Sequence, residues 1–250
     1  MERALTSIGI ACAVGLFVLF LGRRHTTLVT DSRRRRPVRG DALPAILIDF
    51  GYWLLGAFIP LFRYLHITPN ALSLLSLPAC LGAAMTVATG HFGFGGPLLL
   101  FAFSLDAWDG VLARELGIAS DAGEVIDATI DRYNDVLVML GFLYYYRADL
   151  FPWLLASAAL VGTVVVSYTR AKGESFGVDT EIGFMQRHER ALCLGVATSV
   201  APAVASFLEA PSSHPYYHAV VVTLGAVALG TNITAIRRAR LVVARLVSRR

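Results

Sequence analysis

Charged residues are scarce in this sequence of 250 residues: they account for 16%, while hydrophobic residues account for 56%. Soluble domains carry about 25% charged residues, so a soluble globule of this composition would expose too much apolar surface. The high apolar content also excludes a disordered chain, which needs low hydrophobicity. Together with a mean hydropathy of +0.61, the composition indicates an integral membrane protein.

Cysteine and lysine are rarer still. The cysteines are Cys12, Cys80 and Cys193. All three lie inside apolar runs, where a free thiol behaves as a small hydrophobe, so no disulfide framework is expected. Lys172 is the only lysine among the 22 basic residues. In a membrane protein the basic excess reflects topology, and we therefore expect no nucleic-acid partner.

Apolar stretches that are long enough to cross a bilayer, roughly 17–25 residues, occur seven times. They lie near 4–21, 69–89, 96–113, 125–146, 152–169, 190–208 and 216–236. The first stretch is followed by Arg23 and Arg24 and has no small-residue cleavage site, which predicts a retained anchor rather than a signal peptide. Thr68 and Pro69 predict a helix start, and the Gly-Gly-Pro run at 95–97 predicts a break between two spans.

An eighth apolar stretch, 43–66, mixes aromatic with ionisable side chains and is typical of a helix lying along the membrane interface. With this helix on the surface, 19 of the 22 basic residues lie on one side of the membrane. Positive-inside bias makes that side cytoplasmic. The sequence thus predicts an all-α integral membrane fold with a six-helix transmembrane core, a cytoplasmic juxtamembrane helix and one extra N-terminal transmembrane helix, in the inner or plasma membrane of the cell.

Five aspartates lie at the facing ends of two predicted spans, where ionisable groups are costly and are by default functional candidates. They are Asp106, Asp109, Asp127, Asp131 and Asp135. Spacings of three and four residues place each set on one helix face, and a connection of about ten residues predicts antiparallel neighbours whose acidic faces meet. Facing carboxylates require cations, and hard oxygen ligands select Mg²⁺ or Mn²⁺. Two divalent ions would balance four aspartates.

Two other interpretations of this acidic cluster stay open. The aspartates could form structural ion pairs with Arg114 and Arg132, although five acids outnumber two bases. They could instead line a proton or cation pathway. Gly110 and Gly123 are either helix-packing glycines or positions at which a phosphate approaches the backbone.

The pattern D-x2-D-G-x2-A-R-x8-G-x3-D-x3-D, which runs from Asp106 to Asp131, resembles the signature of the CDP-alcohol phosphotransferases at every fixed position. These membrane enzymes displace CMP from a CDP-linked donor with an alcohol. The resemblance covers roughly 44–240 and implies a homodimer and a CDP-diacylglycerol-like lipid donor. The phosphotransferase domain is accordingly expected at 43–240. An anchor at 1–22 and an Arg-rich cytoplasmic linker at 23–42, which lie outside the usual pattern of the family, precede it, and a basic cytoplasmic tail is expected at 237–250.

The resemblance also implies roles for individual residues. It implies that two Mg²⁺ or Mn²⁺ ions are held by Asp106, Asp109, Asp127 and Asp131. It makes Asp131 the general base as well. The CDP moiety would be faced by Gly110, Ala113, Arg114 and Gly123. Asp135 lies outside the signature, and either support of the metal ligands or a helix-to-helix hydrogen bond is expected there instead of metal ligation.

Two basic segments, 167–174 and 183–190, resemble stretches of the phosphatidylinositol phosphate and archaetidylinositol phosphate synthases. The basic residues of those enzymes hold inositol phosphate. The resemblance therefore implies an acceptor pocket that is formed by Arg170, Lys172, Arg187 and Arg190. Membrane topology alone would also explain these cations.

Other reactions stay open at this point. Phosphatidylglycerophosphate synthase, which uses glycerol phosphate, is the nearest rival because its acceptor is also phosphorylated. Serine, free inositol and phosphatidylglycerol are further acceptors. A membrane aromatic prenyltransferase also binds pyrophosphate through aspartates and Mg²⁺, but Ala113 stands where its motif carries another acid.

Overall fold

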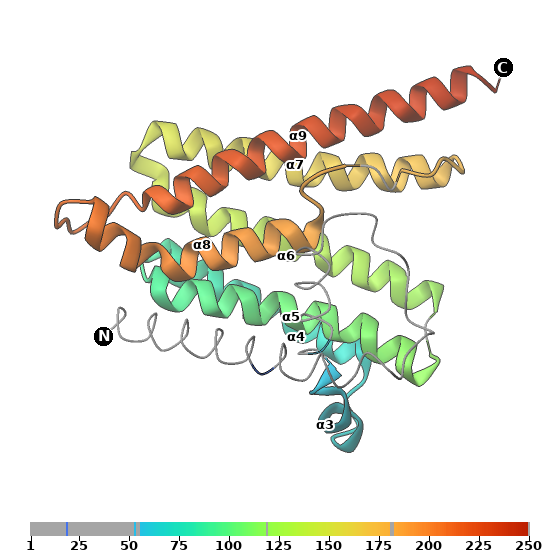
Figure 1. Ribbon diagram of the computed structural model, residues 1–250. Helices are drawn as coiled ribbons and strands as arrows, with labels where there is room; N and C mark the ends of the chain where they lie inside the picture. The colour runs from blue at the N-terminus through green and yellow to red at the C-terminus, as the bar shows by residue number, and fades with distance from the viewer. Residues whose placement is uncertain (1–18, 20–52, 54–55, 119, 181–182, 250) are drawn as a thin grey trace.

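The computed structural model describes residues 19, 53, 56–118, 120–180 and 183–249, and within these ranges the fold is all-helical (Figure 1). The helices are α3 (Ile59–Tyr64), α4 (Pro69–Ala88), α5 (Phe92–Leu116), α6 (Asp121–Tyr145), the short 3-10 helix η1 (Tyr146–Ala148), α7 (Leu150–Ser175), α8 (Arg187–Leu208) and α9 (His218–Val247). The predicted anchor, apart from Leu19, the Arg-rich linker and most of the 43–58 segment lie outside the described residues.

Among the described residues, five helices are long and apolar enough to cross a membrane: α4, α5, α7, α8 and α9. Helix α6 has 25 residues but carries four charged residues between 127 and 135. Those charges lower its hydropathy, although its length is that of a span. The prediction of an all-α integral membrane protein is confirmed for these five candidate spans.

The six long helices form a closed ring in which each packs against two neighbours. The order around the ring is α4, α5, α8, α9, α7, α6 and back to α4. Figure 1 shows α7 and α9 running side by side along one edge. Helices α5 and α6 barely touch each other, because both pack against α4. The expectation that they are directly packed neighbours is therefore wrong, and their acidic faces meet only where the two helices approach their connection.

The predicted break at 95–97 is also wrong, because these residues lie inside α5. The two glycines serve close packing instead. A side chain at Gly96 would collide with the backbone of Ser199 in α8, and one at Gly95 would collide with Val87 in α4. Small residues at such crossings let membrane helices approach closely. The start predicted at Thr68 is confirmed: its side chain accepts from the Ala71 N–H at the beginning of α4.

Several helices are longer than the apolar stretches that predicted them. Helix α5 runs to Leu116 and α6 begins at Asp121, so the connection is four residues, 117–120, rather than about ten. Gly117, with φ of 67°, ends α5 in the left-handed conformation, and the Ser120 side chain caps α6. Helix α9 likewise continues to Val247, which makes most of the predicted tail helical. Apolar content marks the membrane boundary, whereas capping residues mark the helix boundary.

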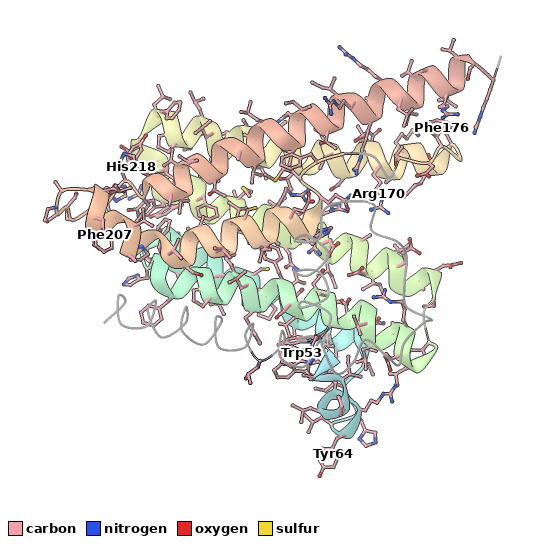
Figure 2. The ribbon with its side chains drawn as sticks, in the orientation of Figure 1. Trp53, Tyr64, Arg170, Phe176, Phe207 and His218 are labelled. Atoms are coloured by element: carbon pink, nitrogen blue, oxygen red, sulfur yellow. The ribbon has the colours of Figure 1, made fainter. Side chains whose placement is uncertain are left out.

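Helix α3 packs against α5 near the same connection. The Phe62 and Trp108 ring centroids lie 5.3 Å apart, with the rings edge to face. Arg63 pairs with Glu115 at 3.1 Å. Figure 2 shows Tyr64 at this corner, with Phe207 and His218 at the opposite end of the bundle. The acidic ends of α5 and α6 therefore lie at the α3 end.

Candidate active site

Three carboxylates from two helices converge beside the connection between α5 and α6. One oxygen each of Asp106, Asp109 and Asp127 lies within 4.8 Å of the other two. Asp109 is buried, and the other two are half-buried. Asp131 lies one helical turn beyond Asp127 and is also buried. The structure thus brings together Asp106, Asp109 and Asp127 of the four aspartates that the sequence predicted to hold metal ions, and the fourth, Asp131, shares the Arg187 guanidinium with Asp106.

A buried chain of hydrogen bonds supports Asp109 from behind. The Ser73 hydroxyl donates to Asp109 Oδ2. The Ser76 hydroxyl donates to the Ser73 carbonyl at 2.6 Å and accepts from Asn134 Nδ2 at 2.7 Å. Helix α4 therefore links the two acidic helices through polar side chains. Sequence reasoning missed these three residues, although each is a polar residue inside an apolar span, which is the signal that could have found them.

A cavity of about 640 Å³ opens beside Asp109 and Asp127. It is lined by Thr68, Pro69, Asn70, Ser73, Asp109, Gly110, Ala113, Arg114, Ile118, Ser120, Asp121, Gly123, Glu124 and Asp127. All four residues expected to face the CDP moiety are in this lining. A Cβ at Gly110 would lie 3.3 Å from the Arg114 guanidinium. Glycine at 110 thus leaves that guanidinium room at the cavity wall.

Arg187, the first residue of α8, lies on the other side of the carboxylates. Its Nη1 donates to Asp106 Oδ2, and its Nη2 lies 2.8 Å from Asp131 Oδ1. Its Nε lies 3.6 Å from Asp135 Oδ1. Asp109 and Asp127 thus line the cavity, whereas Asp106 and Asp131 face Arg187. The carboxylates form a row with a cavity on one side and a guanidinium on the other.

The alternative in which Arg114 and Arg132 form ion pairs with the aspartates holds in part. Arg132 forms an ion pair with Asp135 at 3.6 Å, whereas Arg114 lines the cavity. The close pairs with Asp106 and Asp131 are made by Arg187. Its partner Asp106 is 81 residues away in the sequence, so spacing along the chain gave no sign of this pairing.

Arg190 lies one turn further along α8 and is buried. Its Nη2 donates to Asp135 Oδ2 at 3.1 Å, and its Nη1 donates to the Met185 carbonyl at 3.1 Å. The helix-to-helix hydrogen bond expected of Asp135 is confirmed, with Arg190 as its partner.

The remaining two basic residues expected in the acceptor pocket make local contacts on α7. Arg170 Nε donates to Glu174 at 2.8 Å, with both side chains about half exposed. Lys172 Nζ lies 4.8 Å from the Phe176 ring centroid. Figure 2 shows Arg170 on α7, closer to the bundle than Phe176 at its tip. The structure therefore brings Arg187 and Arg190 to the carboxylates, while Arg170 and Lys172 remain predictions for the acceptor pocket.

Membrane helices that bring aspartates to a cavity with glycine in its wall form a site that suits divalent metal ions and a phosphate-linked substrate. Residues 66–246 match the family described as CDP-alcohol phosphatidyltransferase. The match spans more than half of the chain, so the chain belongs to this family and is a membrane enzyme of phospholipid synthesis. The resemblance seen in the sequence is confirmed, and the prenyltransferase alternative is removed.

Two relatives illustrate the family. The chain is 29% identical over 187 residues to the phosphatidylinositol phosphate synthase of Cutibacterium acnes, which covers 70% of this chain and 87% of the relative. It is 33% identical over 135 residues to the archaetidylinositol phosphate synthase of Pyrococcus horikoshii. The aligned region covers 54% of this chain and 70% of the relative.

Solved structures of the phosphatidylinositol phosphate synthase of Mycobacterium tuberculosis share this fold. The structure with CDP-DAG bound has a TM-score of 0.64 at 26% identity and covers 75% of this chain and 92% of that one. The structure in complex with manganese and citrate has a TM-score of 0.65 at 26% identity. It covers 75% of this chain and 88% of that one.

Proposed function

We propose that this enzyme transfers the lipid phosphate group of a CDP-diacylglycerol-like donor to inositol phosphate and releases CMP. The observation that carries the transferase chemistry is the meeting of Asp106, Asp109 and Asp127 at the edge of the cavity. The choice of acceptor is supported by Arg187 beside the carboxylates. It is also supported by relatives that are inositol phosphate lipid synthases by name.

The carboxylate row fits divalent metal ions. Within the part of the chain that the structure describes, Asp106 Oδ1 and Asp127 Oδ1 are buried and accept no hydrogen bond. Carboxylate oxygens are the ligands that Mg²⁺ and Mn²⁺ prefer, and a related structure contains manganese. We assign two ions to Asp106, Asp109, Asp127 and Asp131, and Arg187 adds one further positive charge beside Asp106 and Asp131.

The residues suggest how the reaction runs. When bound, the metal ions would neutralise the pyrophosphate and stabilise the leaving phosphate. The acceptor hydroxyl oxygen attacks the phosphorus that carries the lipid, the bond from that phosphorus to the CMP oxygen breaks, and CMP leaves with the bonding electrons. Asp131 accepts the hydroxyl proton. A phosphorylated acceptor bound to Arg187 would lie next to this base, because the two side chains are 2.8 Å apart.

The cavity suits the donor. Its lining includes Gly110, Ala113, Arg114 and Gly123, which we assign to the CDP moiety. The Arg114 guanidinium would bind a phosphate oxygen there, and the absent side chains of the two glycines would let the nucleotide approach the backbone.

We further propose a six-span core in which α6 is the sixth crossing. Helix α6 has the length of a span and lies between α4 and α7 in the ring. Positive-inside bias then places the carboxylate row at the cytoplasmic face of the cell membrane. The proposed organisation keeps the anchor at 1–22, the linker at 23–42, the catalytic domain at 43–240 and the basic end at 237–250, in a homodimer.

An acceptor panel tests this function. Purified enzyme is given CDP-diacylglycerol with inositol phosphate, free inositol, glycerol phosphate, serine or phosphatidylglycerol, with and without Mg²⁺ or Mn²⁺. We expect metal-dependent CMP release with inositol phosphate and little with free inositol, with the lipid product identified by mass spectrometry. Preference for glycerol phosphate would make the enzyme a phosphatidylglycerophosphate synthase instead, and equal use of an uncharged alcohol would remove the phosphate-binding role of Arg187.

A further inference from the structure

The segment 183–186 leads directly into Arg187 and is held by contacts to two helices. It is not itself helical. Arg187 is the first residue of α8, where the backbone N–H groups have no partner within the helix and the helix can fray. The position of the Arg187 guanidinium therefore depends on what fixes the residues before it.

The hydroxyl of Thr234 in α9 makes two hydrogen bonds to the backbone of Phe184. We call this contact the clasp. This hydroxyl accepts from the Phe184 N–H at 3.2 Å and donates to the Phe184 carbonyl at 2.7 Å. Thr234 is buried, with 3% of its surface exposed. Phe184 itself is exposed, but both hydrogen bonds are partly buried, and this one side chain bonds two backbone groups that no helix serves.

Other contacts also hold the 183–186 segment against α9. Gly183 has a φ of 133°, and a Cβ there would collide with the Thr234 methyl group. Met185 is buried against Gly230 of α9. The Met185 carbonyl accepts from Arg190. The clasp therefore ties α9 to the start of α8 at the residues immediately before Arg187.

The first residues of α8 connect the held Phe184 backbone to Arg187. Gln186 and Glu189 form a capping box, in which the Gln186 N–H donates to Glu189 at 2.7 Å. The capping box ties Gln186 to the first turn of α8. We therefore expect a displacement of Phe184 to move Arg187, which follows three residues later.

We propose that Thr234 is a positioning residue for the acceptor side of the active site, because it holds Phe184 and thereby keeps Arg187 against Asp106 and Asp131. This inference rests on the proposed function, in which Arg187 binds the acceptor phosphate. Thr234 itself touches neither substrate nor carboxylate.

Kinetics of three variants test the clasp. Thr234→Val keeps the shape of the side chain and removes both hydrogen bonds, so we expect the acceptor KM to rise about tenfold while the donor KM stays within twofold. Thr234→Ser keeps the hydroxyl and should restore the wild-type acceptor KM. Thr223→Val is the matched control, because the Thr223 hydroxyl donates only to Ala219 of its own helix. It should leave both KM values unchanged.

Hydrogen–deuterium exchange provides a second measurement that does not depend on the acceptor. Peptides covering 183–187 should exchange roughly tenfold faster in Thr234→Val than in the wild type, and at the wild-type rate in Thr234→Ser and Thr223→Val. Unchanged exchange, or a Ser variant as impaired as the Val variant, would overturn the clasp. If exchange rises as expected but Arg187→Gln leaves the acceptor KM unchanged, the acceptor assignment fails and the positioning role fails with it. If Arg187→Gln raises that KM and Thr234→Val does not, only the positioning role fails.

Discussion

Arg190 of α8 and Asp135 of α6 form a buried ion pair, with Nη2 and Oδ2 3.1 Å apart and each side chain about 5% exposed. The pair joins two helices that are not neighbours in the ring. It lies one helical turn from Asp131 on α6, so the same contact that holds the helices also fixes the inner end of the carboxylate row.

This pair predicts a stability effect. Removing one partner of a buried ion pair costs about 3–5 kcal/mol when the other charge is left without compensation. Arg132 and Arg187 each lie 3.6 Å from Asp135, so we expect Arg190→Met to lower the melting temperature in detergent by less than this range implies, and the double variant Asp135→Leu/Arg190→Met to recover part of the loss. Arg245→Met, at an exposed position of α9, is the control. A single variant as stable as the control would contradict the assignment.

The metal assignment predicts loss of both activity and metal binding. Asp106→Asn, Asp109→Asn and Asp127→Asn should each abolish most CMP release, because each removes a ligand. They should also lose the rise in melting temperature that Mn²⁺ gives the wild type. Asp149→Asn, between η1 and α7, is the matched control. Near-normal turnover in any of the first three variants would refute the assignment.

The assignment of the base predicts a kinetic effect with little change in binding. Asp131→Asn should lower kcat by roughly 10²–10⁴-fold, the range for a lost general base, while CDP-diacylglycerol still binds. Binding is measured separately by equilibrium titration. A parallel loss of donor binding and turnover would make Asp131 a ligand alone.

The acceptor assignment predicts a selective change in KM. Arg187→Gln should raise the KM for inositol phosphate about ten- to a hundred-fold, because a hydrogen bond to a charged group contributes about 1.5–3 kcal/mol. The donor KM should change much less. Arg245→Gln removes a charge from α9 at an exposed position and should leave both constants unchanged. A purely topological role for Arg187 predicts reduced yield with normal kinetics instead.

The contacts of Glu209 predict that the stability of the fold depends on pH. Glu209 follows α8 directly, at the end far from the carboxylates. Its carboxylate accepts from the N–H groups of Tyr216 and His218 at 2.8 and 2.9 Å. Burial acts to raise the pKa of Glu209, but hydrogen bonds from the backbone and imidazole of His218 and from the Tyr217 and Tyr216 backbone outweigh it and hold the pKa below its ordinary value of 4.5.

A carboxylate whose pKa is lower in the folded state stabilises the fold above the unfolded pKa, and this contribution is lost as the pH falls through the folded pKa. Glu209→Gln should therefore melt a few degrees below the wild type at pH 6, and the difference should shrink as the pH falls below about 4.5. Melting curves of both proteins across this range provide the measurement. A difference that persists unchanged at low pH would assign the effect to shape rather than charge.

The transmembrane helices and the acidic cluster could be predicted from the sequence, because both depend on local contrasts. Apolar runs of membrane length stand out in any chain, and aspartates such as Asp106 and Asp127 stand out within them. Helix ends were less predictable, since α9 continues past its apolar stretch to Val247 and carries arginines beyond that stretch.

The connections across the ring could not be predicted, because nothing in the local pattern encodes them. Arg187 lies 81 residues from Asp106, and its role as the counter-charge depends on the packing of α8 against α5. Ser73, Ser76 and Asn134 are less conspicuous than aspartates, since neutral polar residues in membrane helices commonly bond to neighbouring helices. The order of helices around the ring likewise follows from packing rather than from periodicity.

The two-sided carboxylate row has a consequence for the order of events in catalysis. In the proposed arrangement a donor lies in the cavity beside Asp109 and Asp127, and an acceptor lies at Arg187 beside Asp106 and Asp131, so both reactants would be bound at once. Direct in-line displacement then needs no lipid-bound enzyme intermediate. Initial-rate plots at several fixed acceptor concentrations should therefore intersect, as for a ternary complex, instead of running parallel.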